Sequence, residues 1–352
     1  MSKAPIWSRP CDCEANARLS VAEIQRLLFM IVRRWDKRDE DSHLSEGTMP
    51  LDPTTPEPPR IVLITDEGML KPTLFTAWTM LRRFKGNAEL HFWGYSLDDW
   101  QWESVAHVAS CNPEVALRPL RLQAADLAGA TPVGDYISEV AMGRLFIPSK
   151  LSGRVLYLDG DVRVTADLSP LFSLDMRGHP LAAVRDYVVS SWMEKGVSPE
   201  HRNAARIDEL SKSMAGADVS TYFNSGVLLL DTDAIVSDPD LCAAMQDLDR
   251  ASKCSWGDQD HLNSVFAGRV RLIDPAYNSS WSRTSDQRRF IQKLGPALCE
   301  LTNAPDAIIH FHGPKKPWKK ARLDLWSRRA RAVFSYRREL AEFSEKYPEL
   351  AF

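Results

Sequence analysis

The chain has 352 residues, which is enough for one large α/β domain with appendages or for two smaller domains. Hydrophobic residues make up 44% and charged residues 26% of the sequence, as in an ordinary soluble globular protein. The formal net charge of −3 provides no general positive field, so we expect no nucleic-acid partner.

Cysteine usage and hydropathy bear on the cellular compartment. The six cysteines form no Cys-x-x-Cys pair, which is typical of free thiols in a reducing environment. No apolar run is long enough to span a bilayer, and the first residues lack the layout of a signal peptide. We therefore expect a cytoplasmic protein.

The first 59 residues differ from the rest of the chain. Apolar side chains recur at helical spacing over residues 20–35, behind a Ser-x-x-Glu capping box, which predicts a helix. We expect this helix to dock on the main domain or on a second subunit. Residues 36–59 are acidic and rich in proline, which is typical of a linker. The sequence thus predicts an N-terminal extension over residues 1–59 and does not define the oligomeric state.

Strand and helix patterns alternate from residue 60 onward. We expect strands over 60–65, 88–93 and 115–120, separated by helices over 71–84 and 97–110. This order is typical of a Rossmann-like parallel sheet. No G-x-G-x-x-G motif follows the first strand, which argues against an ordinary NAD or FAD site, and there is no P-loop. Phosphate groups would have to be neutralised by other means, for which a metal ion is suited.

The stretch that organises the rest is Arg154–Phe172. Residues 155–158 form an apolar run typical of a strand buried on both faces, and the run ends at Asp159-Gly160-Asp161. Two carboxylates at the end of a buried strand repel each other and are costly to desolvate, so a cation is expected there. A divalent metal shared with a phosphate fits this position, and Gly160 allows a sharp turn. The alternative is an ordinary surface turn, in which Asp and Gly are common.

The second half of the chain continues the alternating pattern. We expect helices over 135–149 and 234–248, another starting within 256–263, and strands over 181–184, 222–230, 270–273 and 307–311. Residues 187–221 are polar and irregular except for a helix near 200–213. We expect this excursion to lie over the carboxyl edge of the sheet, where open α/β proteins bind ligands, and to act as a lid.

The C-terminal segment is strongly basic. Residues 315–338 hold ten Lys and Arg against the single acid Asp324, and an apolar helical face could form from Trp326, Val333, Leu340 and Phe343. Cations around an apolar face favour a membrane-surface helix. The alternative is a helix that packs on the domain and turns its basic face to solvent.

Four segments in this order resemble glycosyltransferase family 8: LYLDGDV, YFNSGVLLL, WGDQDHLN and IIHFHGPKKPW. The resemblance covers roughly residues 60–320. It implies a single Rossmann-like nucleotide-sugar domain of the GT-A type over 60–318, with a mixed, mostly parallel central sheet, followed by the basic tail over 319–352. It also implies Mn²⁺, or Mg²⁺ in its place, a UDP-hexose donor, and transfer with retention of anomeric configuration.

The resemblance assigns residues to the metal and the diphosphate. Asp159 and Asp161 match the metal-binding Asp-x-Asp, and His310 matches the histidine that completes the metal ligands. Mixed nitrogen and oxygen ligands suit Mn²⁺. Gly313 and Lys316 match the H-x-x-G-x-x-K motif, in which glycine permits close approach and lysine neutralises the diphosphate.

The remaining matches concern the nucleoside and the transferred sugar: Asp66 and Arg144 for the donor, and Asp186, Asn224, Asp258 and Gln259 around the sugar. Asn224 could instead shape a turn, and Asp258 could cap the helix that follows it. Met69 lies near the position where the family usually has an aromatic ring that could stack on uracil. Gly160 replaces a residue that is more often larger, which would loosen the turn.

The resemblance predicts a retaining, Mn²⁺-dependent hexosyltransferase that moves glucose or galactose to a glycan, lipid-linked glycan or lipopolysaccharide-type acceptor, with the tail near the inner face of the membrane. Gln259 is a poor nucleophile, so front-face attack is expected rather than double displacement. Two alternatives stay open: a glycogenin-like enzyme with a soluble acceptor, and a non-catalytic regulatory protein that binds sugar nucleotides.

Overall fold

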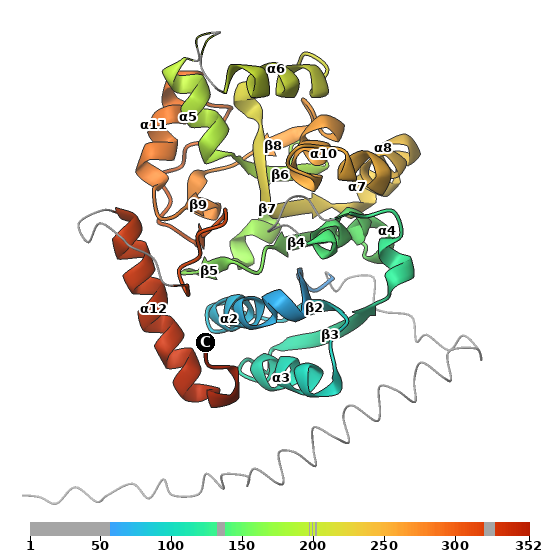
Figure 1. Cartoon of the computed structure of the whole chain (residues 1–352), viewed down its shortest axis with the longest axis vertical. Helices are drawn as coiled ribbons and strands as arrows, with labels where there is room; N and C mark the ends of the chain where they lie inside the picture. The colour runs from blue at the N-terminus through green and yellow to red at the C-terminus, as the bar shows by residue number, and fades with distance from the viewer. Residues whose placement is uncertain (1–56, 132–137, 197, 199, 201–202, 320–327) are drawn as a thin grey trace, which may run out of the picture. The chain divides into compact units, whose positions relative to one another are not determined.

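The computed structural model describes residues 57–131, 138–196, 198, 200, 203–319 and 328–352. Within these residues the core is a seven-stranded sheet in the order β3-β2-β1-β4-β7-β6-β8 (Figure 1). Its strands are β1 (Arg60–Asp66), β2 (Ala88–Tyr95), β3 (Val115–Leu122), β4 (Arg154–Leu158), β6 (Leu181–Arg185), β7 (Phe223–Asp231) and β8 (Val270–Leu272). All neighbours pair in parallel except that β7 runs antiparallel to β4 and β6. The α/β class and the mixed, mostly parallel sheet are therefore confirmed.

Helices cover both faces of this sheet. They are α2 (Leu70–Leu81), α3 (Asp99–Ala109), α4 (Ile147–Lys150), α5 (Tyr187–Lys195), α6 (Ala204–Ser213), α7 (Thr232–Val236), α8 (Pro239–Met245), α9 (Leu248–Ser252), α10 (Asp258–Val265), α11 (Thr284–Leu294) and α12 (Arg328–Lys346). Short 3-10 helices connect them: η1 (Glu67–Met69), η2 (Ala124–Leu127), η3 (Glu139–Phe146), η4 (Ser169–Ser173), η5 (Val219–Thr221), η6 (Pro275–Tyr277) and η7 (Pro348–Leu350).

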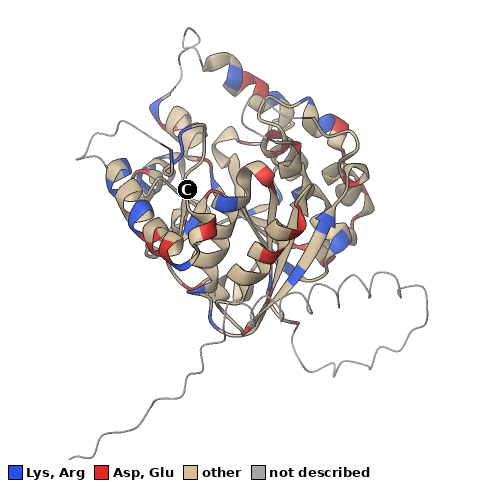
Figure 2. Ribbon diagram, turned by 60° about the horizontal axis from the view of Figure 1, so that its bottom comes forward, with Lys and Arg blue, Asp and Glu red and all other residues tan. Residues whose placement is uncertain are grey.

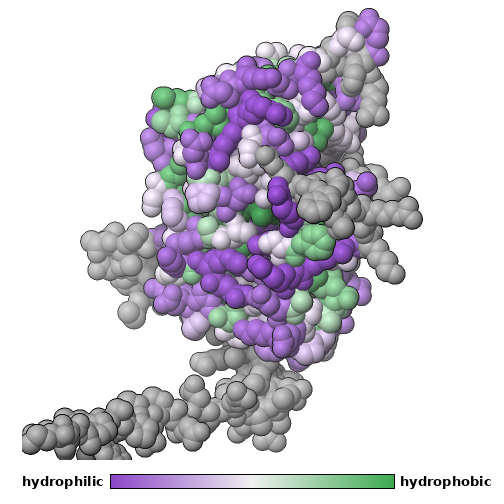
Figure 3. All heavy atoms as spheres, turned by 90° about the vertical axis from the view of Figure 1, so that its left-hand side faces the viewer, coloured by the Kyte–Doolittle hydropathy of each residue, from purple (hydrophilic) through white to green (hydrophobic). Residues whose placement is uncertain are grey.

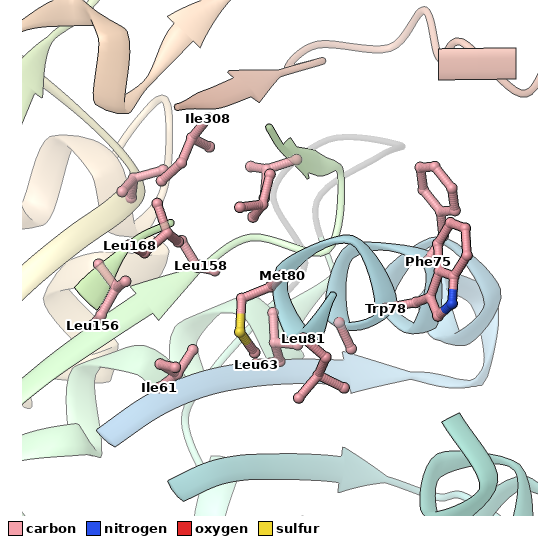
Figure 4. Close-up of a cluster of buried hydrophobic side chains, with 14 of the residues drawn as sticks. Ile61, Leu63, Phe75, Trp78, Met80, Leu81, Leu156, Leu158, Leu168 and Ile308 are labelled. Atoms are coloured by element: carbon pink, nitrogen blue, oxygen red, sulfur yellow. The ribbon is translucent and has the colours of Figure 1, made fainter. Parts of the chain in front are cut away.

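The alternation of side chains along the strands divides the core into two layers. Ile61 and Leu63 of β1 pack with α2, α3 and α12, whereas Val62 and Ile64 pack with η3, α7, α8 and α10. This is the two-residue period of a strand that is buried on both faces. Figure 4 shows Ile61 and Leu63 on the side of the sheet that α2 covers.

A second, three-stranded sheet lies beside the first within the described residues. It consists of β5 (Val162–Val164), β10 (Ile308–His310) and β9 (Ser279–Ser280), with β10 antiparallel to β5 and parallel to β9. β5 directly follows Asp161, and His310 pairs in register with Val162. The chain from far downstream is thereby brought next to the turn at residues 159–161.

The strands expected from the sequence are confirmed to within two residues at each end. The expectation that residues 187–221 are irregular except for a helix near 200–213 is wrong over Tyr187–Lys195, because Asp186 caps a helix there by accepting from Val188 N. The single helix expected over 234–248 is broken at Pro239, which starts α8 with Asp238 as its N-cap. The helix expected over 135–149 is a 3-10 helix and one short α-turn within the residues described there. The helix expected over 20–35 lies outside the described residues.

The basic C-terminal segment folds as α12 against the domain. Val333, Leu340 and Phe343 are buried, and the Phe343 ring lies 5.7 Å from that of Phe75 and 5.4 Å from that of Trp78. The apolar face that favoured a membrane-surface helix is therefore covered by the protein itself, and the packed alternative is the observed one. Trp326 lies outside the described residues.

The surface agrees with this packing. The side of the molecule that carries α11 and α12 is mostly hydrophilic (Figure 3). Along the described part of the chain, the positions of Lys and Arg are interspersed with those of Asp and Glu (Figure 2). Among the described residues, no helix is both long and apolar enough to cross a membrane.

If α12 is part of the core, Phe343→Ala should lower the free energy of unfolding by about 3–5 kcal/mol, because it leaves a cavity against α2. Urea denaturation measures this loss. Phe334→Ala is the matched control on the same helix, because its ring is 54% exposed, and it should change the value by less than about 0.5 kcal/mol. Equal effects of the two substitutions would contradict the packing.

Candidate functional site

All eleven sequence-predicted site residues line one cavity of about 370 Å³. The cavity lies at the carboxyl ends of β1, β4 and β6, and the amino end of β7 reaches the same edge because this strand runs antiparallel. The residues are Asp66, Arg144, Asp159, Asp161, Asp186, Asn224, Asp258, Gln259, His310, Gly313 and Lys316. Met69, noted for its place near the nucleoside end, lines it too.

Three of these side chains converge. His310 Nε2 lies 3.1 Å from Asp161 Oδ1 and 3.7 Å from Asp159 Oδ2. The other oxygen of Asp159 is held by the Tyr157 hydroxyl at 2.6 Å and by Arg144 Nη2 at 3.0 Å. One candidate metal-ligating atom of each of the three residues lies within 4.8 Å of the other two. Among the described residues, this is the only group of three or more His, Cys, Asp or Glu side chains that meets this condition.

The donor set fits a divalent cation of the Mn²⁺ type, because it offers two carboxylate oxygens and one imidazole nitrogen. Gly226 of β7 makes the convergence possible. A Cβ atom at this position would lie 2.2 Å from His310 Cε1 and 2.6 Å from Asp159 Oδ2. Only glycine leaves room for both side chains against this strand.

Lys316 supplies positive charge at the same place. Its ammonium group forms an ion pair with Asp161, through the carboxylate oxygen that does not face His310. Burial alone would raise the pKa of Asp161, but the Lys316 ammonium group and the His310 ring in its protonated form outweigh it and hold that pKa well below its ordinary value. Asp161 is therefore an ionised, buried carboxylate that faces two nitrogen groups.

The turn at Gly160 is tightly packed, contrary to the expectation that glycine loosens it. A Cβ atom here would lie 2.1 Å from Thr73 Oγ1. Thr76 Oγ1 also donates to Gly160 O at 3.0 Å. Helix α2 occupies the space that a larger side chain would need, and its two threonines hold the turn in place.

Arg144 connects Asp258 to the candidate metal ligands Asp159, Asp161 and His310, which are together called the metal corner below. Its guanidinium lies over the Tyr157 ring, 4.5 Å from the centroid, and pairs with Asp159 and, through Nε, with Asp258 Oδ2 at 3.1 Å. Burial raises the pKa of Asp258 to about 6, although Arg144 opposes the shift. The alternative that Asp258 caps α10 is wrong, because the N-cap is Gly257.

The three residues that the resemblance assigns to the transferred sugar, besides Asp258, form a hydrogen-bonded group, called the sugar end below: Asn224, Gln259 and Asp186. Asn224 Nδ2 donates to Gln259 Oε1 at 2.9 Å and to Asp186 Oδ2 at 3.2 Å. Gln259 Oε1 also accepts from Ser225 N at 3.2 Å. Asp186 has a structural task as well, because its Oδ1 accepts from two backbone amides at the start of α5.

Sequence reasoning missed two residues that hold this site. Tyr157 was interpreted only as part of an apolar strand, yet its hydroxyl donates to Asp159. Asn278 lies between His310 and Asn224, at 3.0 Å from His310 Nδ1 and 2.9 Å from Asn224 Oδ1. A tyrosine two residues before Asp159 was a usable signal, since alternate side chains of an extended segment point to one face. Nothing in the sequence around Asn278 indicated its position.

Residues 129–322, just over half of the chain, match a family model described as Glycosyl transferase family 8. Glycosyltransferase GlyB of Streptococcus pneumoniae serotype 4 is 30% identical over 186 residues, covering 52% of this chain and 39% of GlyB. Lipopolysaccharide 1,2-glucosyltransferase of Escherichia coli K12 is 30% identical over 171 residues, covering 47% of this chain and 44% of that enzyme.

A solved structure shares the fold. Galactosyltransferase LgtC, in complex with donor and acceptor sugar analogs, superposes with a TM-score of 0.59 at 20% identity, covering 78% of this chain and 95% of LgtC. The chain spans less than half the length of the two curated relatives named above.

Gly226→Ala should weaken Mn²⁺ binding at least about tenfold, because the new methyl group displaces His310 or Asp159 from the metal corner. Electron paramagnetic resonance of free Mn²⁺, titrated without nucleotide, measures the affinity. Gly68→Ala is the matched control, since its Cβ would meet only Asp66 Oδ1 at 3.4 Å. Equal Mn²⁺ affinity in wild type and Gly226→Ala would contradict the proposed ligand set.

The raised pKa of Asp258 predicts a pH dependence of stability. The folded pKa of about 6 exceeds the ordinary 3.8, so the folded protein binds more protons between these values. The contribution of this carboxyl to the free energy of unfolding is therefore present at low pH and lost as pH rises through about 6. The loss between about pH 5 and about pH 7.5 is on the order of 1 kcal/mol.

Asp258→Asn cannot titrate, so its stability relative to wild type should rise by that amount over the same pH interval. Urea denaturation in metal-free buffer measures the difference. Asp249→Asn, at a side chain that is 78% exposed, is the control and should show no such trend. A difference that does not change with pH would contradict the shifted pKa.

Proposed function

The chain belongs to glycosyl transferase family 8, and from this we propose that it transfers a hexose, glucose or galactose, from a UDP-sugar to a hydroxyl group of a glycan acceptor. The observation that carries the proposal is the convergence of Asp159, Asp161 and His310 in a cavity that Lys316 also lines. The relatives named above support the sugar class, since one is named as a lipopolysaccharide glucosyltransferase and one as a galactosyltransferase.

The metal corner suits the departing diphosphate. A Mn²⁺ or Mg²⁺ ion bound by Asp159, Asp161 and His310 would supply a Lewis acid that neutralises charge on the leaving UDP. Lys316 pairs with Asp161 and so places a second positive charge beside the same group. Gly313 has φ +87° and no atom within 4 Å of where a Cβ would be, so a diphosphate could approach the backbone closely.

Asp66 and Arg144 complete the proposed donor site. Asp66 Oδ1 accepts from Met69 N at 3.0 Å, which fixes the carboxylate at the end of β1 beside Met69. We assign the nucleoside to this end of the cavity. Arg144 forms ion pairs with Asp159 and Asp258 and also donates to the backbone oxygens of Ala141 and Ser225, so its contribution is to hold the two carboxylates in place.

The sugar end supports front-face retention. Gln259 is an amide, and its carbonyl oxygen already accepts from Asn224 and from Ser225 N. Asp258 forms an ion pair with Arg144, and this charge pairing lowers its value as a nucleophile. The acceptor hydroxyl would therefore attack on the side of the leaving group and give its proton to a phosphate oxygen. Trapping of a glycosyl adduct on Asp258 or Asp186 would overturn this mechanism.

Three further parts belong to the same proposal. The acceptor is a lipopolysaccharide-type or lipid-linked glycan, the protein acts in the cytoplasm, and the transferase domain covers residues 60–318 between the extension 1–59 and the tail 319–352. A glycogenin-like activity is the alternative in the same class. Transfer to lipopolysaccharide core oligosaccharides rather than to maltooligosaccharides separates the two.

The full chain should release UDP from UDP-glucose or UDP-galactose when Mn²⁺ is present and lose this activity with a chelator. Asp161→Asn replaces a charged ligand atom with a neutral one, and kcat should fall at least about a hundredfold. Coupled detection of UDP measures turnover, and the exposed Asp249→Asn serves as the matched control. Mn²⁺-dependent binding of UDP-sugars without UDP release in wild type would assign the protein to the non-catalytic binders instead.

The substitution Lys316→Met tests the role of the lysine separately from the role of the metal ligands. Removing a cation that faces Asp161 should leave Mn²⁺ affinity equal or higher in the absence of nucleotide, because repulsion between like charges is lost. Turnover should still fall, because the leaving diphosphate loses a positive partner. Weaker Mn²⁺ binding in this variant would show that Lys316 does not act on the diphosphate alone.

A further inference from the structure

Two buried amides connect the metal corner to the sugar end of the cavity. Asn278 is 3% exposed and Asn224 is 9% exposed, and both are hydrogen-bonded at each end of the side chain. Asn278 does not line the cavity, whereas Asn224 and His310 do. The hydrogen bonds along such a chain of amides all run in one defined order of donor and acceptor, because each amide donates through nitrogen and accepts through oxygen.

The direction of the chain is set by a backbone group. Gly226 N–H donates to Asn224 at 3.1 Å, and a backbone N–H cannot accept, so the Asn224 atom that faces it must be Oδ1. The other end agrees. Asn224 Nδ2 faces Gln259 Oε1, which is itself identified as oxygen because Ser225 N donates to it.

Asn224 then dictates the orientation of Asn278. The Asn278 atom 2.9 Å from Asn224 Oδ1 must be a donor, so it is Nδ2. Its oxygen therefore faces His310 Nδ1 at 3.0 Å. An amide oxygen only accepts, and hence the proton of this contact must be on the imidazole nitrogen Nδ1.

A proton on Nδ1 determines what the other ring nitrogen of His310 presents to the two aspartates. With the proton fixed on Nδ1, the other nitrogen of a neutral ring presents its lone pair to Asp161 Oδ1 and Asp159 Oδ2. A lone pair and two carboxylates that face one another repel unless a cation lies between them. The hydrogen bond at the far side of the ring thus prepares the near side to bind a metal ion.

We propose that Asn278 is a positioning residue that fixes the tautomer and ring orientation of His310 for metal binding, and that Gly226 N–H sets it through Asn224. The inference rests on the proposed function in that it takes His310 as a metal ligand. It adds a physical link between the two ends of the cavity, since Asn224 also holds Gln259 and Asp186.

The surroundings of Asn278 support a fixed position. Its backbone oxygen accepts from Gln287 Nε2 at 3.3 Å, and Gln287 Oε1 accepts from Ser280 N at 2.9 Å. Ser280 in turn pairs in register with His310 across β9 and β10. Helix α11 and the small sheet therefore hold Asn278 and His310 in one unit.

Two substitutions distinguish the hydrogen bond of Asn278 to His310 from its hydrogen bond to Asn224. Asn278→Leu removes both hydrogen bonds at similar volume, whereas Asn278→Asp keeps an oxygen for His310 Nδ1–H and loses the donor to Asn224. Mn²⁺ affinity without nucleotide should fall about 10- to 100-fold in Asn278→Leu and be equal or higher in Asn278→Asp. Turnover should fall in both, because Asn224 loses its partner in each.

Nitrogen-15 spectra of the imidazole rings give a readout that needs neither turnover nor added metal. The His310 signals are assigned by their loss in His310→Gln, and pH is raised until one ring nitrogen loses its proton. In wild type, Nε2 should lose it and Nδ1 should keep it. In Asn278→Leu this preference should disappear, and in Asn278→Asp it should persist.

A wild-type His310 that keeps its proton on Nε2 would overturn the proposal, as would unchanged Mn²⁺ affinity in folded Asn278→Leu. The wild-type spectrum decides the matter even where the leucine variant does not fold. If wild type binds no Mn²⁺, the proposed function fails at its metal site. The tautomer measured in the same sample still tests Asn278 separately.

Discussion

The pairing of β10 with β5 is the constraint on which the site depends. β5 begins directly after Asp161, and the antiparallel register places His310 opposite Val162. Phe311 N donates to the backbone oxygen of Asp161 at 3.0 Å, so backbone hydrogen bonds extend up to the residue that carries the carboxylate. An imidazole from late in the chain is thus fixed beside an acidic turn from its middle, with little conformational entropy left to lose when a ligand binds.

Charge balance follows from this arrangement. Asp159, Asp161 and Asp258 lie close together around the cavity, and buried carboxylates are costly unless cations face them. Arg144 pairs with two of them and Lys316 with the third. The protein therefore compensates its own acids while leaving an oxygen of each Asp-x-Asp residue directed toward His310. Ionised side chains that are held in place while part of their bonding capacity stays directed at one point are typical of functional sites.

The sequence was informative where one physical solution dominates. A four-residue apolar run is typical of a strand that is buried on both faces, and β4 was found for that reason. The sequence was less informative where one pattern fits two structures equally well. The apolar stripe of α12 fits a bilayer surface or a protein surface, and only the contact of Phe343 with Phe75 and Trp78 decides between them. Asn278 left no periodic trace at all, because its role arises from two partners distant in sequence.

The packing of Thr73 against Gly160 restricts how this protein can change over evolutionary time. A Cβ atom at Gly160 would lie 2.1 Å from Thr73 Oγ1, so position 160 cannot take a larger residue unless Thr73 shrinks or moves. The same helix begins just after Met69, at the end of the cavity assigned to the nucleoside. Altering the middle residue of the acidic turn thus shifts the helix that borders the end of the cavity assigned to the nucleoside. Substitutions at Gly160 and in the first turn of α2 are consequently expected to be coupled in their effects.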